Sequence, residues 1–287
     1  MRAAVLREGR MVYRDDVPDP IPGPGQVLVG VRSCGICGSD LHFAKYGAEV
    51  LSLSDAMASS LGGGGMNIDL SHDIFMGHEF SVEVLEAGPD TETHPAGTLV
   101  TSIPVLISGK HVEPIVYSNK TLGGYAERML LSAPLLLRIP NGLDHRQAAL
   151  TEPMAVGLHA VNKSGIQPGE TALVLGCGPI GIAVIAALRT HGVESIVAAD
   201  FSSKRRELAA VMGAHQTLEP GTGLTIRHRH SRCDIRGGGD TRHHRRRDAQ
   251  SRARHSAGSG GGVYATRHRA SLLRHRQGDQ RPVRSRL

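Results

Sequence analysis

A glycine-rich turn near the middle of the chain constrains the fold more than any other feature. Its glycines follow the pattern Gly176-x-Gly178-x-x-Gly181, between the apolar run 171–175 and a second apolar run that ends near residue 188. A third apolar run ends at Asp200, 19 residues after Gly181. This order of strand, glycine turn, helix and strand predicts a βαβ unit of a doubly wound parallel sheet that binds a dinucleotide, the Rossmann arrangement.

Each glycine of this turn has a physical role in the predicted site. Gly176 allows the tight first turn, Gly178 lets the backbone approach the pyrophosphate, and Gly181 lets the helix pack on the strand. Pro179 and Ile180 lie where the helix begins, and a helix N-terminus attracts phosphate. A glycine turn without a ligand is the alternative. A membrane span over the same residues is disfavoured, because the glycines and the proline interrupt it.

Asp200 predicts which dinucleotide binds. Its carboxylate would accept hydrogen bonds from the adenosine ribose hydroxyls and would repel a 2′-phosphate, which favours NAD over NADP. Lys204 and Arg205 follow closely and keep NADP open as the less favoured choice. The predicted cofactor-binding residues are Gly176, Gly178, Pro179, Ile180, Gly181, Asp200 and Arg205.

Charge divides the chain into two parts of opposite character. The net charge is +6 over all 287 residues, but 17 Arg, no Lys and 4 acidic residues lie from residue 221 onward. That part carries +13, so residues 1–220 carry −7. After residue 220 we find no sustained helical or strand periodicity, and we expect the basic tail to be disordered because it cannot bury enough apolar surface.

The four cysteines are too irregularly spaced for a disulfide framework, which favours metal binding or plain thiols. No charged leader followed by an apolar run opens the chain, and we expect a cytosolic protein. Cys37, His78, Glu79 and Glu152 are residue types that bind zinc. Their spacing alone does not select them as one site.

Four segments in order carry a family resemblance: GICGSDLH, GHEF, TEPMAVGLHAV and the glycine turn. Together they resemble the zinc-dependent medium-chain dehydrogenase/reductase (alcohol dehydrogenase) family, and the Glu of TEP is similar to its sorbitol, threonine and butanediol dehydrogenase branch. The resemblance implies a GroES-like β-rich domain over 1–155 and an incomplete Rossmann domain over 156–220. The basic tail over 221–287 lies outside it.

The resemblance also implies roles for individual residues. Cys37 and His78 would hold a catalytic zinc, with Glu79 and Glu152 completing or exchanging within its coordination shell. Ser39 would take the proton of the substrate hydroxyl and pass it through the nicotinamide ribose to His42. Asp40 would orient His78 from behind.

Two departures from the family concern the first 220 residues. Many members carry four closely spaced cysteines that bind a structural zinc, but residues 90–120 contain none, so we expect one catalytic zinc and no structural zinc. The segment between Cys37 and His78 is longer than expected. Its part from 43 to 74 includes four consecutive glycines and predicts a flexible surface loop.

The third departure is the tail. Its residues have GC-rich codons and Lys codons are AT-rich, so the composition predicts a GC-rich gene translated out of frame, with the Rossmann sheet truncated after its second helix or third strand. We therefore expect an open strand edge, low stability and weak or absent activity. The competing hypothesis is a non-catalytic protein whose Arg clusters, such as Arg245 to Arg247, bind nucleic acid without sequence specificity.

The sequence thus predicts a zinc-dependent oxidoreductase that transfers hydride between a secondary alcohol or polyol and NAD. The expected partner is this small-molecule substrate, with no membrane and no specific nucleic acid. The resemblance implies a homo-oligomer for intact relatives, formed through the sheet edge that is missing here.

Overall fold

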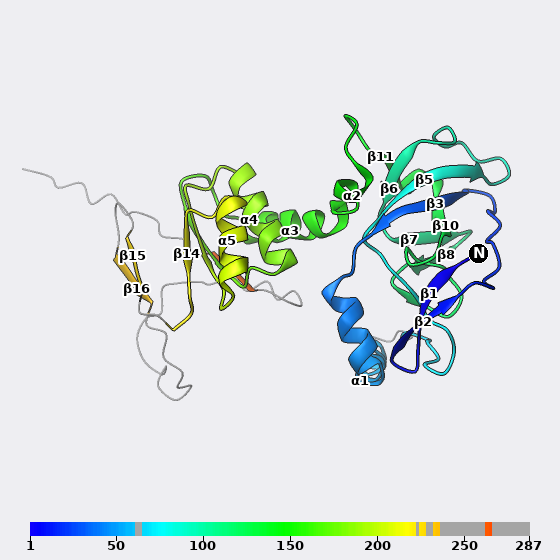
Figure 1. Ribbon diagram of the computed structural model, residues 1–287, viewed down its shortest axis with the longest axis horizontal. Helices are drawn as coiled ribbons and strands as arrows, with labels where there is room; N and C mark the ends of the chain where they lie inside the picture. Colours follow the sequence, from blue (N-terminus) through cyan, green and yellow to red (C-terminus); the bar gives the residue numbers. More distant parts are fainter. Residues whose placement is uncertain (61–64, 222–223, 228–231, 236–261, 266–287) are drawn as a thin grey trace, which may run out of the picture.

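The computed structural model describes residues 1–60, 65–221, 224–227, 232–235 and 262–265. Figure 1 shows two lobes joined by helices. One lobe is β-rich and contains the N-terminus. The other has helices packed beside a small sheet. This division agrees with the predicted combination of a β-rich and a Rossmann-like unit, while the exact boundary at 155 stays a prediction because that residue lies inside a helix.

A five-stranded antiparallel sheet forms the centre of the β-rich lobe, in the order β10-β3-β5-β6-β11. Alternation of apolar residues along the central strands places Val27, Val29, Val82 and Val84 in one buried cluster, each no more than 1% exposed. The strands are β3 (Gln26–Cys34), β5 (Phe80–Ala87), β6 (Leu99–Ser102), β10 (Arg128–Ser132) and β11 (Leu136–Arg138), the last preceded by the short 3₁₀ helix Ala133–Leu135.

Three smaller antiparallel ribbons surround this sheet, formed by β1 with β2, β4 with β9 and β7 with β8. The β7–β8 ribbon occupies the segment where the sequence lacks the four cysteines. Their bounds are β1 (Ala3–Arg7), β2 (Arg10–Arg14), β4 (Phe75–Met76), β7 (Val105–Ser108), β8 (His111–Pro114) and β9 (Tyr117–Ser118).

The prediction of a flexible loop over residues 43–74 is wrong for the first half of that segment. This part forms α1 (Gly38–Ser60), which has a non-helical residue at Tyr46. Phe43 is 1% exposed and stacks on Tyr117 with 4.0 Å between ring centroids, which anchors an otherwise mostly exposed helix. Tertiary anchoring and a run of helix formers therefore outweighed the small polar residues. Three of the four glycines, together with Leu61, lie outside the described residues.

Helices α2 (His145–Ala148) and α3 (Thr151–Ser164) lead from one lobe to the other, and α3 ends at Gly165 as the sequence predicted. α3 packs closely on α4 (Pro179–Thr190). A Cβ atom at Gly157 would lie 2.6 Å from the backbone carbonyl carbon of Ala183. The close approach of these helices therefore depends on that glycine.

The second lobe contains the predicted βαβ unit. β12 (Thr171–Leu175) pairs in parallel with β13 (Ser195–Ala199), which pairs in parallel with β14 (Gln216–Leu218). α4 connects the first two strands and α5 (Ser203–Val211) connects the last two. The core includes Val184, Ile185, Leu188 and Ile196, each at most 1% exposed.

Three short strands lie in the basic tail, where the sequence predicted no regular element. β15 (Leu224–Arg227) pairs with β16 (Arg232–Ile235), and β17 (Gly262–Ala265) pairs with β12 in antiparallel orientation. We expected an open strand edge in this sheet, but the edge of β12 is paired with β17, because free backbone groups at a strand edge accept another strand. The remainder of the predicted disordered tail lies outside the described residues.

Within the described part of the chain, none of the helices has both the length and the apolar character that a membrane crossing requires.

Candidate active site

Strand pairing brings the first predicted zinc ligands together. Cys34 at the end of β3 lies opposite Phe80 at the start of β5, so the segments that follow and precede them are neighbours. The N–H of Gly35 donates to the carbonyl of Glu79 at 2.7 Å. A Cβ atom on Gly35 would overlap the Glu79 carboxylate, so the Glu79 side chain packs directly against this glycine.

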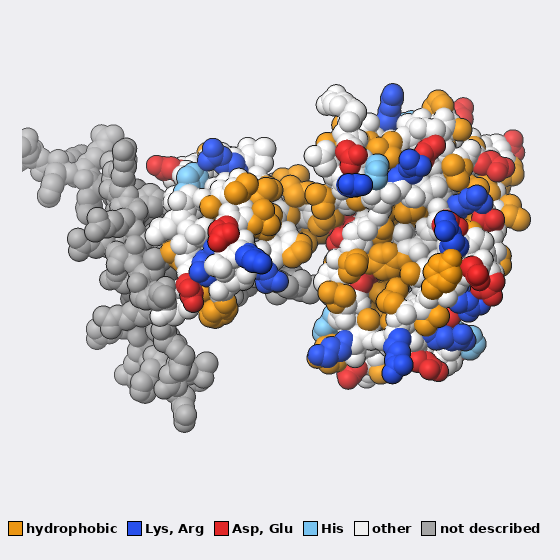
Figure 2. Space-filling view, in the orientation of Figure 1, with side chains coloured by type: hydrophobic (Ala, Val, Ile, Leu, Met, Phe, Trp, Pro, Cys, Tyr) orange, Lys and Arg blue, Asp and Glu red, His pale blue; other side chains and the backbone are white. Residues whose placement is uncertain are grey.

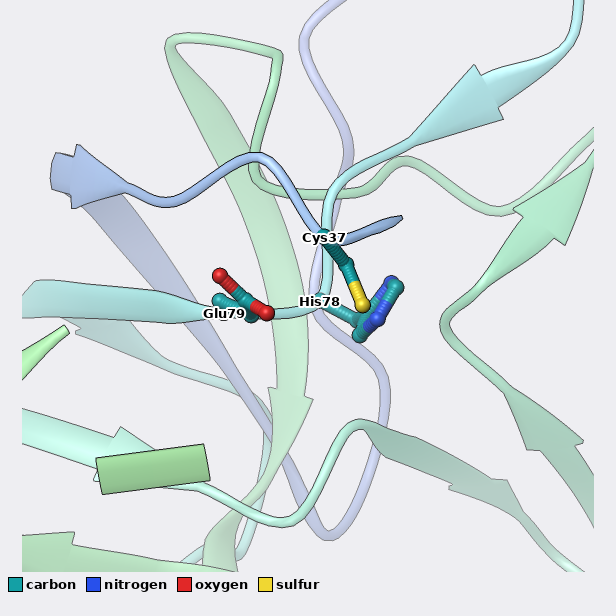
Figure 3. A group of neighbouring side chains, drawn as sticks. All are labelled: Cys37, His78 and Glu79. Carbon is teal, nitrogen blue, oxygen red and sulfur yellow. The ribbon is translucent and has the colours of Figure 1, made fainter. Parts of the chain in front are cut away.

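Cys37, His78 and Glu79 form a compact group whose possible ligand atoms all lie within 4.8 Å of one another. Figure 3 shows the Cys37 sulfur beside the imidazole of His78, with the Glu79 carboxylate on the other side of the sulfur from the ring. His78 and Glu79 are 7% and 8% exposed. A thiolate, an imidazole and a carboxylate at this spacing match the donor set of a catalytic zinc site.

Asp40 lies behind this group, as the resemblance implied. Its Oδ2 accepts a hydrogen bond from the backbone N–H of Cys37 at 3.0 Å, and its Oδ1 lies 3.6 Å from Nδ1 of His78. Those last two atoms are buried and have no hydrogen-bond partner. Leaving a buried imidazole nitrogen and a buried carboxylate oxygen without hydrogen bonds costs free energy. These two atoms would form a hydrogen bond with each other when a metal held the ring through its other nitrogen.

The neighbouring charges dominate the protonation of His78. Burial alone would lower its pKa, but a hydrogen bond with Cys37 and the negative charges of Asp40, Cys37 and Glu152 raise the pKa above its usual value. A metal cation would replace the proton as the positive charge that these groups favour.

Glu152 lies in the first turn of α3 and outside the compact group. Burial raises the pKa of its carboxyl, His78 lowers it, and Glu79 and Asp40 raise it further. Glu152 is therefore close enough for the charges of the site to shift the pKa of its carboxyl. Its predicted role as an exchanging ligand stays a prediction.

Ser39 and His42 lie one turn apart at the start of α1. Ser39 is half-buried and interacts with the hydroxyl of Tyr117, whose pKa burial raises to about 12. His42 is exposed and its ring lies 5.0 Å from that of Tyr46. Of the two predicted proton-relay residues, Ser39 is therefore half-buried and His42 lies at the surface.

The glycine turn has the geometry predicted for a phosphate loop. Gly176 has a φ of +89°, a conformation that favours glycine, and its N–H donates to the carbonyl of Ala199 at 2.8 Å. Gly178 caps α4, and Pro179 with Ile180 begins it. A Cβ atom on Gly181 would overlap the carbonyl oxygen of Gly176.

Asp200 lies at the end of β13 with both carboxylate oxygens bonded to this region. The N–H groups of Cys177 and Ser202 each donate to it at 2.8 Å. Burial opposes its ionisation, but these N–H groups and then Arg205 and Arg206 lower its pKa below the usual value. The Arg205 guanidinium is 3.8 Å away and mostly exposed, so it is free to contact a ligand.

Sequence reasoning missed several residues that shape the metal site. Tyr125, Tyr117 and Gly77 carry no motif of their own, since their importance follows from pairing of distant segments. Gly77 has a φ of +99°, and its position directly before His78 was the one available signal.

The comparisons with known proteins agree with this geometry. Residues 23–141 match the alcohol dehydrogenase GroES-like domain. The chain is 33% identical over 222 residues to (R,R)-butanediol dehydrogenase of Bacillus subtilis, covering 75% of this chain and 62% of the relative. It is 30% identical over 272 residues to (R,R)-butanediol dehydrogenase of Saccharomyces cerevisiae, covering 79% of this chain and 68% of that relative.

The chain belongs to the zinc-dependent medium-chain dehydrogenase/reductase family. This is a family of oxidoreductases, and relatives include dehydrogenases named for butanediol and sorbitol. A solved structure from Sinorhizobium meliloti 1021, described as a zinc-binding dehydrogenase and bound to NADP, is 29% identical with a TM-score of 0.64, over 77% of this chain and 62% of that one. The chain spans about three fifths of the length of the first curated relatives.

Proposed function

We propose that this chain binds one catalytic zinc ion and NAD, and transfers hydride between a secondary alcohol or polyol and the nicotinamide. The observation that carries the proposal is the compact group of half-buried Cys37 with buried His78 and Glu79, next to the unpaired oxygen of Asp40. No second metal group is found among the described residues, and residues 90–120 lack cysteine, so we propose a single zinc.

Cys37 and His78 would hold the ion, with Glu79 or Glu152 as a further ligand. Bound zinc supplies Lewis-acid chemistry, lowering the pKa of a substrate hydroxyl beside it. Charge supports this assignment, because the negative groups around His78 raise its pKa despite burial and so favour a positive charge at this place.

Proton removal is assigned to α1. Ser39 would accept the proton of the substrate hydroxyl and pass it through the ribose of the nicotinamide to His42. Because His42 is exposed, it can release the proton to water.

The cofactor is assigned to the turn at Gly176 and to Asp200. The N-terminus of α4 would hold the pyrophosphate, and the ionised Asp200 would bind ribose hydroxyls and repel a 2′-phosphate. The similar structure from Sinorhizobium meliloti is bound to NADP, so the proposed preference of this chain for NAD should be tested first.

The activity test uses the 287-residue chain, NAD and a panel of secondary alcohols and polyols, with and without a zinc chelator. We expect chelator-sensitive NAD reduction that Cys37→Ala lowers at least about a hundredfold, because loss of a direct ligand should cost no less than the roughly 10- to 100-fold typical of a partner behind a ligand. Cys34→Ala is the matched control, because Cys34 is the neighbouring thiol outside the metal group, and it should retain activity within a few fold. Equal activity of both variants would contradict the assignment.

The basic tail supports one alternative, a non-catalytic protein that binds nucleic acid without sequence specificity. Its 17 Arg over 67 residues would contact phosphates in a salt-dependent way. Tight DNA binding together with no chelator-sensitive turnover would favour this alternative over the dehydrogenase.

A further inference from the structure

The carboxylate of Asp40 contacts both segments that carry the proposed zinc ligands. One oxygen accepts from the N–H of Cys37 at 3.0 Å and the other lies 3.6 Å from Nδ1 of His78. Asp40 is only 3% exposed, so bulk water does not fix the orientation of its carboxylate. Another protein group must therefore hold it.

Tyr125 is that group. Its hydroxyl donates to Oδ2 of Asp40 at 2.7 Å and also lies 3.2 Å from the carbonyl oxygen of Gly35. A hydrogen bond from a hydroxyl to an ionised carboxylate is among the stronger kinds in proteins. Burial and this hydrogen bond raise the pKa of the Tyr125 hydroxyl, so it keeps its proton at neutral pH and remains a donor.

The backbone around Tyr125 is fixed to the segment that carries His78. The N–H of Tyr125 donates to the carbonyl of Met76 at 3.1 Å, and the N–H of Gly124 donates to that of Gly77 at 2.8 Å. A Cβ atom on Gly77 would lie 2.8 Å from the Tyr125 ring. The ring therefore lies tightly against the ligand segment, and its hydroxyl has a defined position.

We propose that Tyr125 is a positioning residue for the metal site, whose hydroxyl holds Asp40 in the orientation that supports His78 and the Cys37 segment. The hydrogen bonds of the Tyr125 hydroxyl go to Asp40 and to the Gly35 carbonyl rather than to a proposed ligand side chain, so it acts through Asp40. The inference rests on the proposed zinc site. Removal of an orienting partner behind a metal ligand typically costs about 10- to 100-fold in metal affinity.

The hydroxyl must be tested separately from the ring, because Tyr125 also lines an apolar groove of about 750 Å³. Figure 2 shows hydrophobic side chains gathered on this face, between α1 and the β1–β2 ribbon. Tyr125→Phe keeps the ring and removes only the hydroxyl. Tyr13→Phe is the matched control, since Tyr13 lines the same groove and is 66% exposed, whereas the hydroxyl that donates to Asp40 belongs to Tyr125.

The readout is the zinc dissociation constant of the full chain, measured by competition with a chromophoric chelator. We expect Tyr125→Phe to weaken zinc binding about tenfold or more, and Tyr13→Phe to change it less than twofold. The thermal midpoint of the metal-free proteins should agree within a few degrees, which separates positioning from a general loss of structure. The visible spectrum of the Co²⁺-loaded protein should change in Tyr125→Phe alone.

A second pair of variants tests whether Tyr125 acts through Asp40. Asp40→Asn should weaken zinc binding by itself, and adding Tyr125→Phe to it should change the affinity less than twofold. Full tenfold loss in both backgrounds would overturn the proposed route. Wild-type affinity of Tyr125→Phe would overturn this inference alone, whereas an unaltered chain that binds no zinc would overturn the metal site and the inference together.

Discussion

Two buried aspartates show how single residues prepare the two sites. Both oxygens of Asp200 accept backbone N–H groups, so its orientation is complete without a ligand. Asp40 instead has one buried oxygen without a hydrogen-bond partner, facing the equally unpaired Nδ1 of His78. We infer that the cofactor loop is organised before binding, while the metal site gains its last polar contact when the ion binds.

Asp200→Asn tests the cofactor preference. Asparagine keeps an oxygen that accepts a backbone N–H but removes the charge that repels a 2′-phosphate. We expect the NADP-to-NAD ratio of dissociation constants to fall about tenfold, which corresponds to roughly 1.4 kcal/mol. Fluorescence titration with both reduced cofactors measures it. Glu194→Gln removes an exposed charge from the same lobe and should leave the ratio unchanged.

The same residue predicts a dependence of stability on pH. The folded-state pKa of Asp200 is lowered, so its stabilising contribution is present above the unfolded pKa of about 3.9 and is lost as pH falls toward the folded value. The gap in thermal midpoint between the wild type and Asp200→Asn should therefore be largest near pH 6 and narrow below about pH 4. A gap that widens on acidification would contradict this assignment.

At the scale of elements, local patterns predicted most of the second lobe. The glycine turn, Asp200 and the spacing of apolar residues located β12, α4, β13 and α5, because short-range steric rules govern them. The segment that became α1 was misread, since the aromatic contact of Phe43 with Tyr117 joins residues far apart in sequence.

The contact between α3 and α4 offers a test at this scale. Gly157→Ala would place a methyl group against the backbone at Ala183, and we expect a loss of about 1–3 kcal/mol in the free energy of unfolding. Gly38→Ala is the control, because a Cβ there meets no atom within 4 Å in α1. Urea unfolding in the presence of a chelator compares the two without a contribution from metal. Equal free energies of unfolding for the two variants would show that α3 and α4 move apart at little cost.

At the scale of the whole molecule, sequence motifs predicted which residues belong to the metal group but could not predict that these residues lie close together. Cys37 and His78 are 41 positions apart, and only the pairing of β3 with β5 brings their segments together. The pairing of β17 with β12 was also beyond local reasoning, because an unpaired strand edge accepts many sequences. The out-of-frame origin of residues 221–287 stays a prediction.

The opposite charges of the two parts of the chain predict how the full protein binds nucleic acid. Residues 1–220 carry −7 and the remainder carries +13. The full chain should bind duplex DNA of any sequence, with affinity that falls at least about a thousandfold between 50 and 200 mM salt, roughly as six or more phosphate contacts require. A chain ending at residue 221 should not bind. Sequence preference, or binding that ignores salt, would argue against a purely electrostatic contact.

We propose that a single zinc ion is held by one thiolate together with nitrogen and oxygen ligands. X-ray absorption at the zinc edge, measured on the purified full chain after metal content is determined, tests it most directly. We predict about one zinc per chain, with one sulfur at about 2.3 Å and the remaining ligands at about 2.0–2.2 Å. The sulfur signal should disappear in Cys37→Ala and persist in Cys34→Ala. A site with several sulfur ligands, or a chain that retains no zinc, would contradict the proposed zinc site.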